Sequence, residues 1–161
     1  MRADANRKSA PSTDDVVDAI VSAHATIESI FFDALHSVLP HVASAEFEVM
    51  EVLFAQGVQR ASAISEALSL APSTLTRYCD QLAALGLITR ERAPQDRRET
   101  LIDLTRKGRN AVKAILSAQA EAYSARLGSI KAADRRVVVQ ALRRIEHEPG
   151  LRAHRVADLG A

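Results

Sequence analysis

Apolar side chains recur at every third or fourth position between Thr13 and Pro40, which predicts one long helix. We expect Thr13 to cap the start of this helix and Pro40 to end it. Apolar residues cover most of the circumference of the helix, so we expect burial on more than one side. The main stripe consists of Ile20, His24, Ile27, Phe31, Ala34, Leu35 and Val38.

The same period predicts five further helices along the chain. We expect Ser44 to cap the second helix and Ser62 to precede a short third one. Pro72 suits the first turn of the fourth, where its missing N–H costs nothing. Gly57 and Gly86 end the second and fourth helices. Two longer helices are expected from Arg106, after a Thr105 cap, to about Leu127, and from about Ala132 to Glu148.

The period changes to two over residues 88–92 and 100–104, which predicts two short strands. The segment 93–99 between them is polar and contains a proline, as expected of a turn. The predicted fold class is therefore mainly α with a small β-hairpin.

Composition supports a globular, mostly helical chain. Hydrophobic residues make up 47% and aromatic residues 4% of the sequence, so aliphatic side chains must build the core. The single cysteine, Cys79, excludes an internal disulfide and a cysteine-based zinc cage. Residues 1–12 are polar and basic, so we expect a disordered arm and not a signal peptide. No stretch is apolar enough to span a membrane, and a cytoplasmic location is expected.

Charge is distributed unevenly along the chain. Residues 13–57 contain eight acidic residues and no lysine or arginine, whereas residues 58–109 contain nine basic and six acidic residues. Residues 110–161 are also net basic. This polarity predicts that an anionic partner binds the later part of the chain, although it is also compatible with ordinary solvation of surface charges.

The helix expected from Pro72 to Leu85 has two different faces. Two short helices joined by a tight turn, the second polar on one side, suit insertion into the major groove of DNA. Short hydroxyls near the helix start suit phosphate contacts, and Arg77 suits a guanine edge or a phosphate. The alternative is an ordinary amphipathic helix with a solvated face. The inward stripe is Leu75, Cys79, Leu82 and Leu85; the opposite face carries Ser73, Thr76, Arg77 and Asp80.

The predicted hairpin is rich in arginine. Arg90 and Arg92 lie on its rising strand, and Arg97 and Arg98 lie at its tip. Such a loop can follow a DNA backbone and place one side chain in the minor groove. Alternatively, the arginines pair with Glu91, Asp96 and Glu99, and we expect at least one such pair, with Asp96 positioning an arginine.

These segments together resemble the MarR family of bacterial transcriptional regulators. The resemblance covers residues 15–147, and one departure is Ala71, where family members often carry a serine or threonine cap. The matching runs are Leu75-Thr76-Arg77, Leu82-Ala83-Ala84-Leu85-Gly86-Leu87-Ile88-Thr89-Arg90, Asp96-Arg97-Arg98 and Leu104-Thr105-Arg106-Lys107-Gly108.

The resemblance implies a winged helix-turn-helix domain over residues 44–105 and a helical dimerisation region over 13–43 and 106–148. A flexible tail, residues 149–161, would follow. It further implies a homodimer on a palindromic operator in double-stranded DNA, acting as a repressor that a small ligand releases, with aromatic compounds the first candidates. The expected DNA-binding residues are Ser62, Ser73, Thr74, Thr76, Arg77, Arg90, Arg97 and Arg98.

Other side chains give weaker indications. His24, Phe31 and Phe32 are candidates for a ligand pocket, and Cys79 for an oxidant sensor, although a cysteine on an inward stripe is usually inert. The histidines of the first helix and its exit lack convincing metal-ligand spacing, so no metal or cofactor is expected. No nucleophile–base set or phosphate loop indicates an enzyme. A winged-helix protein-interaction module that does not bind DNA remains the alternative of a different class.

Overall fold

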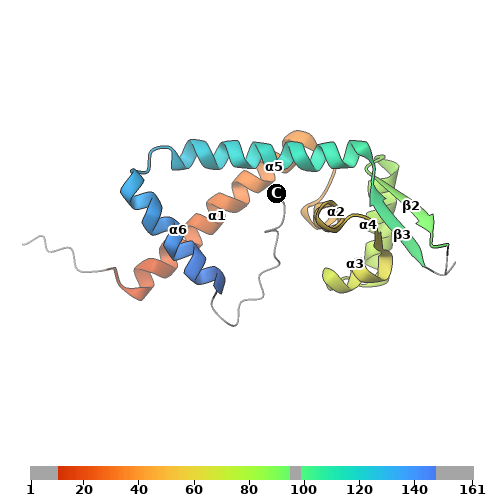
Figure 1. Ribbon diagram of the computed structural model, residues 1–161, viewed down its shortest axis with the longest axis horizontal. Coiled ribbons are helices and arrows are strands. Elements are labelled where there is room, and N and C mark those ends of the chain that lie inside the picture. The colour runs from red at the N-terminus through yellow and green to blue at the C-terminus, as the bar shows by residue number, and fades with distance from the viewer. Residues whose placement is uncertain (1–10, 95–98, 148–161) are drawn as a thin grey trace, which may run out of the picture.

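The computed structural model of the chain describes residues 11–94 and 99–147. It is mostly helical with one small antiparallel sheet, as the sequence predicts. Helix α5 runs along the molecule; α2–α4 and the strands lie at one of its ends, and α1 and α6 extend toward the other (Figure 1). The elements are α1 (Thr13–Val38), α2 (Ser44–Gln56), β1 (Gln59–Arg60), α3 (Ala61–Ala67), α4 (Pro72–Ala84), β2 (Ile88–Arg92), β3 (Thr100–Leu104), α5 (Arg106–Leu127) and α6 (Ala132–His147).

The cap of α1 lies one residue before the predicted position. Ser12, and not Thr13, is the N-cap, and its hydroxyl accepts a hydrogen bond of 3.1 Å from the backbone N–H of Asp15. The Asp15 carboxylate in turn accepts from the Ser12 hydroxyl at 2.7 Å and from the Ser12 N–H at 2.9 Å, and these two bonds lower the pKa of the carboxyl. The prediction of Thr13 was wrong because the reciprocal carboxylate, three residues after the cap, decides the position.

The predicted starts of α2 and α3 were also wrong. Ser44 is the first residue of α2 and follows the N-cap Ala43, whose N–H donates to the carboxylate of Glu46 at 3.0 Å. Ser62 lies inside the first turn of α3, because Arg60 is the N-cap. In α2 the carboxylate of Glu46, inside the helix, takes the place of a hydroxyl cap. In α3 the extended residues of β1 determine where the helix begins.

The sheet contains a strand that the sequence did not reveal. The strand order is β1-β3-β2, with Ile88 opposite Leu104 in the hairpin and Gln59 opposite Ile102 at the other edge. Strand β1 is only two residues long, too short to show an alternating pattern. It nevertheless ties the start of α3 to the hairpin.

The core of the protomer lies where α2 meets α4, α5 and the sheet. It is aliphatic, as the composition predicts, with Phe47 as its fully buried aromatic side chain. The largest fully buried residues are Phe47, Leu35, Met50, Leu53, Ile64, Leu82, Leu87, Ile102 and Ile115.

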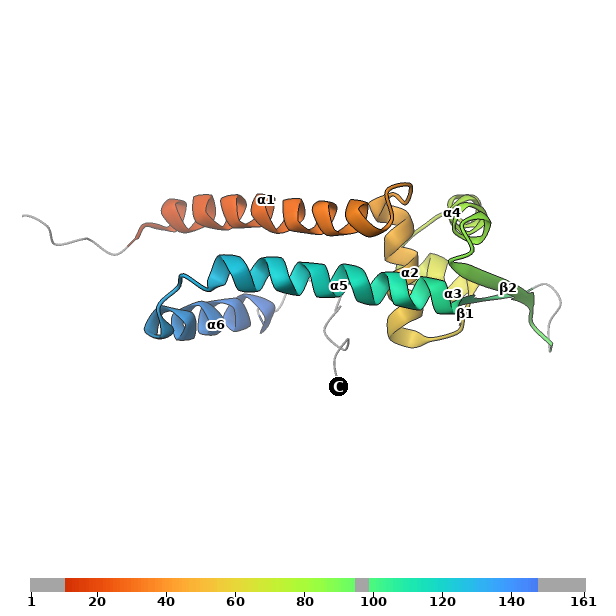
Figure 2. The same cartoon turned by 90° about the horizontal axis from the view of Figure 1, so that it is seen from above.

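Helix α1 is buried only near its C-terminal end. Ile30, Ala34 and Leu35 are its buried residues, whereas Ile20 and Ile27 are each 48% exposed. Figure 2 shows α1 alongside α5, with α6 on the other side of α5. The expected burial on more than one side is therefore not met within one protomer, because α5 covers only part of the apolar circumference.

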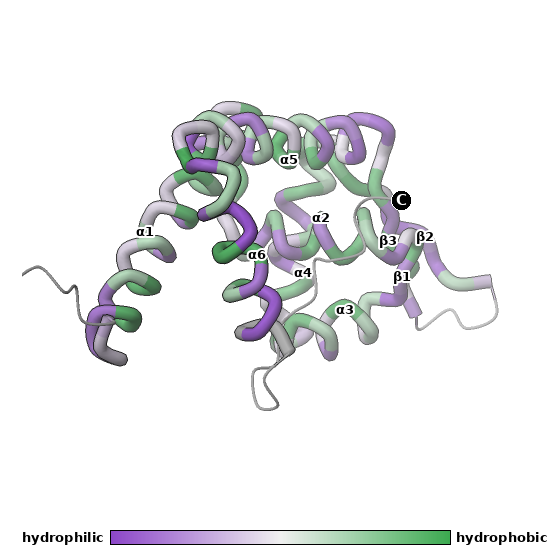
Figure 3. Tube along the Cα trace, turned by 60° about the vertical axis from the view of Figure 1, so that its left-hand side comes forward, coloured by the Kyte–Doolittle hydropathy of each residue, from purple (hydrophilic) through white to green (hydrophobic). Residues whose placement is uncertain are grey.

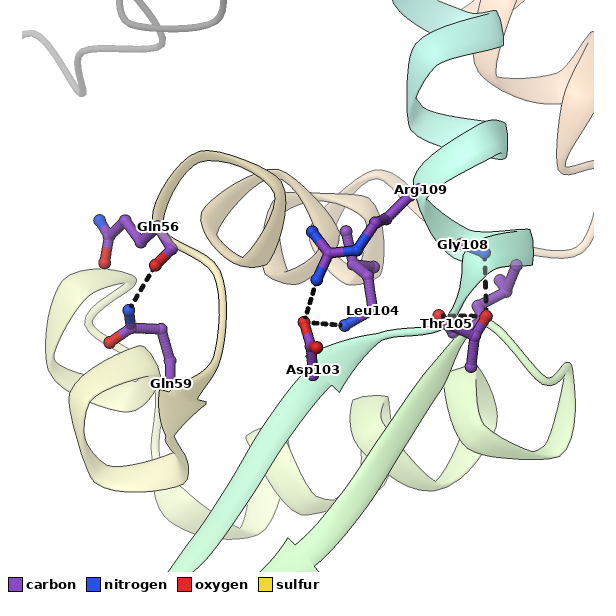
Figure 4. Close-up of polar contacts among 8 residues, drawn as sticks. Gln56, Gln59, Asp103, Leu104, Thr105, Gly108 and Arg109 are labelled. Carbon is purple, nitrogen blue, oxygen red and sulfur yellow. Dashed lines mark hydrogen bonds and ion pairs between the residues drawn. The ribbon is translucent and has the colours of Figure 1, made fainter.

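A network of short contacts joins the start of α5 to the end of α4. The Thr105 hydroxyl donates to the Gly86 carbonyl at 2.8 Å. It also accepts from the Gly108 N–H at 3.0 Å (Figure 4). The Lys107 ammonium donates to the Leu85 carbonyl at 2.8 Å. Thr105 is thus the predicted cap of α5 and also the link to the preceding helix. We call these contacts the α4–α5 junction.

Gly108 allows the junction to close. A Cβ added there would overlap the carbonyl oxygen of Leu87, a backbone atom that cannot swing aside. Gly108→Ala should therefore lower the free energy of unfolding by about 1–3 kcal/mol, the usual cost of overpacking. Urea denaturation checks this, with Gly128→Ala at the other end of α5 as the matched control. Equal stability of the two variants would contradict the role given to Gly108.

Glu51 on α2 makes the stability depend on pH. Burial raises its pKa to about 7, and the neighbouring carboxylate of Glu48 adds to the rise. Because the pKa is higher in the folded state, the neutral form is favoured there, and the associated stability is lost as pH rises from about 4.5 through about 7. Glu51→Gln should flatten this part of the pH profile, measured by urea unfolding between pH 4 and 8. The exposed Glu66→Gln is the control, and an unchanged profile in Glu51→Gln would refute the assignment.

No helix within the described residues is both long and apolar enough to cross a membrane.

Candidate nucleic-acid interface

Helices α3 and α4 are joined by a tight turn. The N–H of Leu70 donates to the carbonyl of Ser65 at 2.9 Å, and Ser69 in the turn has a positive φ of 52°. Ala71 is the N-cap of α4 and forms no side-chain cap bond, so Pro72 at the first helical position sets the entry into the helix. The geometry is that of a helix-turn-helix.

Helix α4 presents the two faces that the sequence predicts. Leu75, Cys79 and Leu82 are buried against the core. Ser73, Thr76, Arg77 and Asp80 are exposed, while Thr74 is half-buried in the first turn and Leu85 is half-buried after the helix. The interior face is therefore committed to packing, and the outer face is available to a partner.

The polar side chains of α4 have few partners among the described residues. The Thr76 hydroxyl donates to the Pro72 carbonyl at 2.9 Å, and the Arg77 guanidinium lies 5.1 Å from the centre of the Tyr78 ring. Gln81 donates to the His41 carbonyl at 3.1 Å and fixes the C-terminal half of the helix. No ion pair of Arg77 occurs among the described residues.

The hairpin of β2 and β3 lies beside α4. Arg90 on β2 forms an ion pair with Asp80 on α4, with 2.5 Å between guanidinium nitrogen and carboxylate oxygen. The sequence predicted that wing arginines pair with acids of the hairpin; the observed partner of Arg90 comes from α4. No sequence rule marks this pair, because ten residues and a change of element separate the partners.

The tip of the hairpin lies outside the described residues. This concerns Arg97 and Arg98, which the sequence proposes as minor-groove residues, and Asp96, proposed to position an arginine. The base of the tip is closed by the Ala93 N–H, which donates to the Glu99 carbonyl at 3.0 Å.

A hollow of about 710 Å³ separates α3, α4 and the hairpin. Its walls carry polar groups from three elements, including Ser62, Thr76 and Arg90, over an apolar floor that includes Leu75. The Ser62 hydroxyl donates to the Glu99 carboxylate at 3.3–3.4 Å, which connects the start of α3 to the hairpin. Ser62 therefore lies at the same surface as the α4 residues.

The residues suggested for a ligand pocket lie elsewhere, on α1. Phe31 packs between Phe32 and Phe47, with ring centres 5.6 and 5.8 Å apart. Phe32 is 41% exposed and stacks on His36, and His24 is exposed with its imidazole 3.6 Å from Glu28. A hollow of about 240 Å³ between α1 and α5 is lined by other residues, including Ile30 and Ala34. Phe31 thus packs against the core. His24 makes no aromatic contact with Phe31 or Phe32 among the described residues.

The described residues bear on metal binding and on the state of Cys79. They contain no cluster of three histidine, cysteine, aspartate or glutamate side chains able to hold a metal ion. Cys79 is 1% exposed, and burial raises the pKa of its thiol to about 11, with Arg90 opposing and Asp80 adding to the shift. At neutral pH the group is therefore a protonated, buried thiol.

The turn between α3 and α4, the exposed face of α4 and the adjoining hairpin define a winged helix-turn-helix. The model of the MarR family matches residues 42–100, which include α3, α4 and β2 and end at the first residue of β3. This part of the chain is therefore similar to the MarR family, and the curated proteins that the chain matches are described as HTH-type transcriptional regulators.

Relatives by sequence come from Bacillus subtilis strain 168. The uncharacterized HTH-type transcriptional regulator YdgJ is 24% identical over 106 residues, 66% of this chain and 65% of YdgJ. The HTH-type transcriptional regulator MhqR is 36% identical over 63 residues, 39% of this chain and 43% of MhqR. The matches thus span less than two thirds of the length of either relative.

The fold is also that of a solved structure. RV1404 from Mycobacterium tuberculosis superposes with a TM-score of 0.83 at 24% identity, and the match covers 89% of this chain and 99% of that one. The predicted combination of helices and a hairpin wing is confirmed by this likeness.

The buried state of Cys79 can be tested by labelling. Because it is the only cysteine and is protonated at neutral pH, a disulfide reagent such as Ellman's reagent should react slowly with the native chain at pH 7.5 and rapidly in urea. Absorbance of the released thiolate follows the reaction. Labelling of the native chain as fast as that of the denatured chain would favour the redox-sensing alternative.

Proposed function

We propose that this chain is a sequence-specific transcriptional regulator that binds double-stranded DNA as a homodimer. The observation that carries the proposal is the exposed polar face of α4 beside an arginine-bearing hairpin. An α-helix fits the major groove, and a hairpin at its side reaches the adjacent backbone and minor groove. The match of residues 42–100 to the MarR family model supports the same function.

The side chains divide by role. We assign Arg77 to a guanine edge or a phosphate, because it is exposed and has no acidic partner among the described residues. The hydroxyls of Ser62, Ser73 and Thr76 are suited to donate to phosphate oxygens. Thr74 is half-buried in the first turn of α4 and is suited to contact DNA from the start of that helix. From the sequence, we assign Arg97 and Arg98 to the minor groove.

The homodimer is supported by apolar surface that the protomer leaves uncovered. Figure 3 shows hydrophobic positions along both α1 and α6. Val21 on α1 is 62% exposed, and Val137 and Leu142 on α6 are 65% and 60% exposed. A second copy covering residues 13–43 and 106–148 would bury them. Two-fold symmetry then favours a palindromic operator with half-sites about one helical turn apart.

Repression relieved by a small effector completes the proposal. A regulator of this kind blocks transcription while bound, and a ligand that changes the spacing of the two reading helices lowers DNA affinity. The structure of NadR in complex with 4-hydroxyphenylacetate, a protein of similar fold with a TM-score of 0.57, supports aromatic compounds as the first to test. Because the proposed target is cellular DNA, we place the protein in the cytoplasm as part of the same proposal.

DNA binding can be tested with Arg77→Ala and Arg98→Ala. Each should weaken binding to a duplex selected by the native chain from a random pool by about 1–3 kcal/mol. Fluorescence anisotropy measures the affinity, and Lys113→Ala on α5, which also removes one positive charge, should bind normally.

Salt dependence separates this function from its alternative. Binding of random duplex DNA should fall steeply as salt rises, because phosphate contacts release counterions. Indifference of the native chain to every duplex at low salt would sink the proposal and favour a protein-interaction module. Normal affinity of both arginine variants would reject the assigned residues only.

A further inference from the structure

Helix α4 carries a carboxylate on the face assigned to DNA. Asp80 is the only acidic residue of the helix, and it lies three and four positions after Arg77 and Thr76, on the same exposed side. Its side chain is 58% exposed. A carboxylate on a surface that meets phosphates is repelled by them, so its presence there requires a physical reason.

The partner of Asp80 supplies that reason. Arg90 on β2 reaches across from the hairpin, and its guanidinium is 2.5 Å from the Asp80 carboxylate. The Arg90 side chain is 35% exposed, so it lies closer to the protein than the aspartate does. Strand β2 lies next to α4 in Figures 1 and 2, and no other ion pair in the described residues joins α4 to the sheet.

An ion pair has two consequences for a surface that binds a polyanion. The paired guanidinium contributes little to counterion release, because its charge is already balanced. The pair also joins the reading helix to the wing, which fixes the relative position of the two parts before DNA arrives. A fixed spacing of α4 and the hairpin favours the DNA sequence on which both elements fit their grooves at the same time.

We propose that Asp80 is a specificity-determining residue: it holds Arg90 away from the DNA backbone and thereby lowers affinity for arbitrary sequences more than affinity for the operator. A released Arg90 would reach a phosphate in any complex, matched or mismatched. The operator complex would gain this contact but lose the fixed spacing of helix and wing. The inference rests on the proposed DNA-binding function.

The test compares two duplexes, one selected by the native chain from a random pool and one with the same bases shuffled. Asp80→Asn should tighten binding to the shuffled duplex about five-fold at 150 mM salt and steepen the salt slope by about 0.9, as one added phosphate contact requires. Affinity for the selected duplex should rise less, so the ratio between the two should fall.

Two further variants separate this role from a loss of structure. Arg90→Ala leaves Asp80 unbalanced and should weaken binding to both duplexes. The double variant Asp80→Asn with Arg90→Ala should return the shuffled-duplex affinity and salt slope to near the native values, an outcome that a purely structural role does not give. Glu121→Gln, an exposed α5 residue with the same change in net charge, is the control and should leave both duplexes unaffected.

Three outcomes would overturn the inference. The first is an unchanged salt slope for the shuffled duplex in Asp80→Asn. The second is an altered preference at a single base pair in that variant, which would mean that Asp80 itself accepts from a base such as cytosine. The third is a gain equal to that of Glu121→Gln, which would reflect net charge alone. If the native chain binds neither duplex, the proposed function itself fails instead.

Discussion

The first turn of helix α5 contacts the turn that follows α4, although strands β2 and β3 separate the two helices in the chain. This contact constrains the whole protomer. Thr105 bonds to two carbonyls of the turn, those of Gly86 and Leu87, at 2.8 and 3.1 Å. Gly108 brings the helix so close to Leu87 that no side chain fits between them. The same few residues therefore end one helix, begin the next and set the distance between them.

The α4–α5 junction matters because α5 belongs to both ends of the molecule. Its first turns pack on the sheet and α2, with Val112 and Ile115 fully buried, whereas its later turns pack along α1. Asp103, at the end of β3, bonds to the Leu104 N–H and pairs with Arg109 of α5, which adds a second link at this point (Figure 4). Hydrogen bonds thus tie the start of α5 to the turn after α4, and the ion pair ties it to β3.

The sequence predicted the helices and the hairpin well because their signals are local. A stripe of apolar residues identifies the face of a helix that packs on the core. Pro72 marks the start of α4, and Gly57 and Gly86, both with positive φ, mark the ends of α2 and α4. Strand β1 and the carboxylate caps were missed because they depend on a partner elsewhere or on a side chain inside the helix. The sequence also gave no sign of the Asp80–Arg90 pair, since no periodicity connects a helix face to the following strand.

The same distinction applies to the surface assigned to DNA. Composition and spacing identify the cations, and an abundance of cations alone explains attraction to any nucleic acid. Selectivity requires that the attraction to DNA of the wrong sequence be weakened. An arginine paired with a carboxylate weakens it, and the complex with the operator loses little affinity. The buried face of α4 contributes as well: Leu75, Cys79 and Leu82 are within 2% of full burial, so the helix cannot rotate to offer other side chains. A rigid helix with one neutralised arginine beside it is therefore a more selective surface than its net charge indicates.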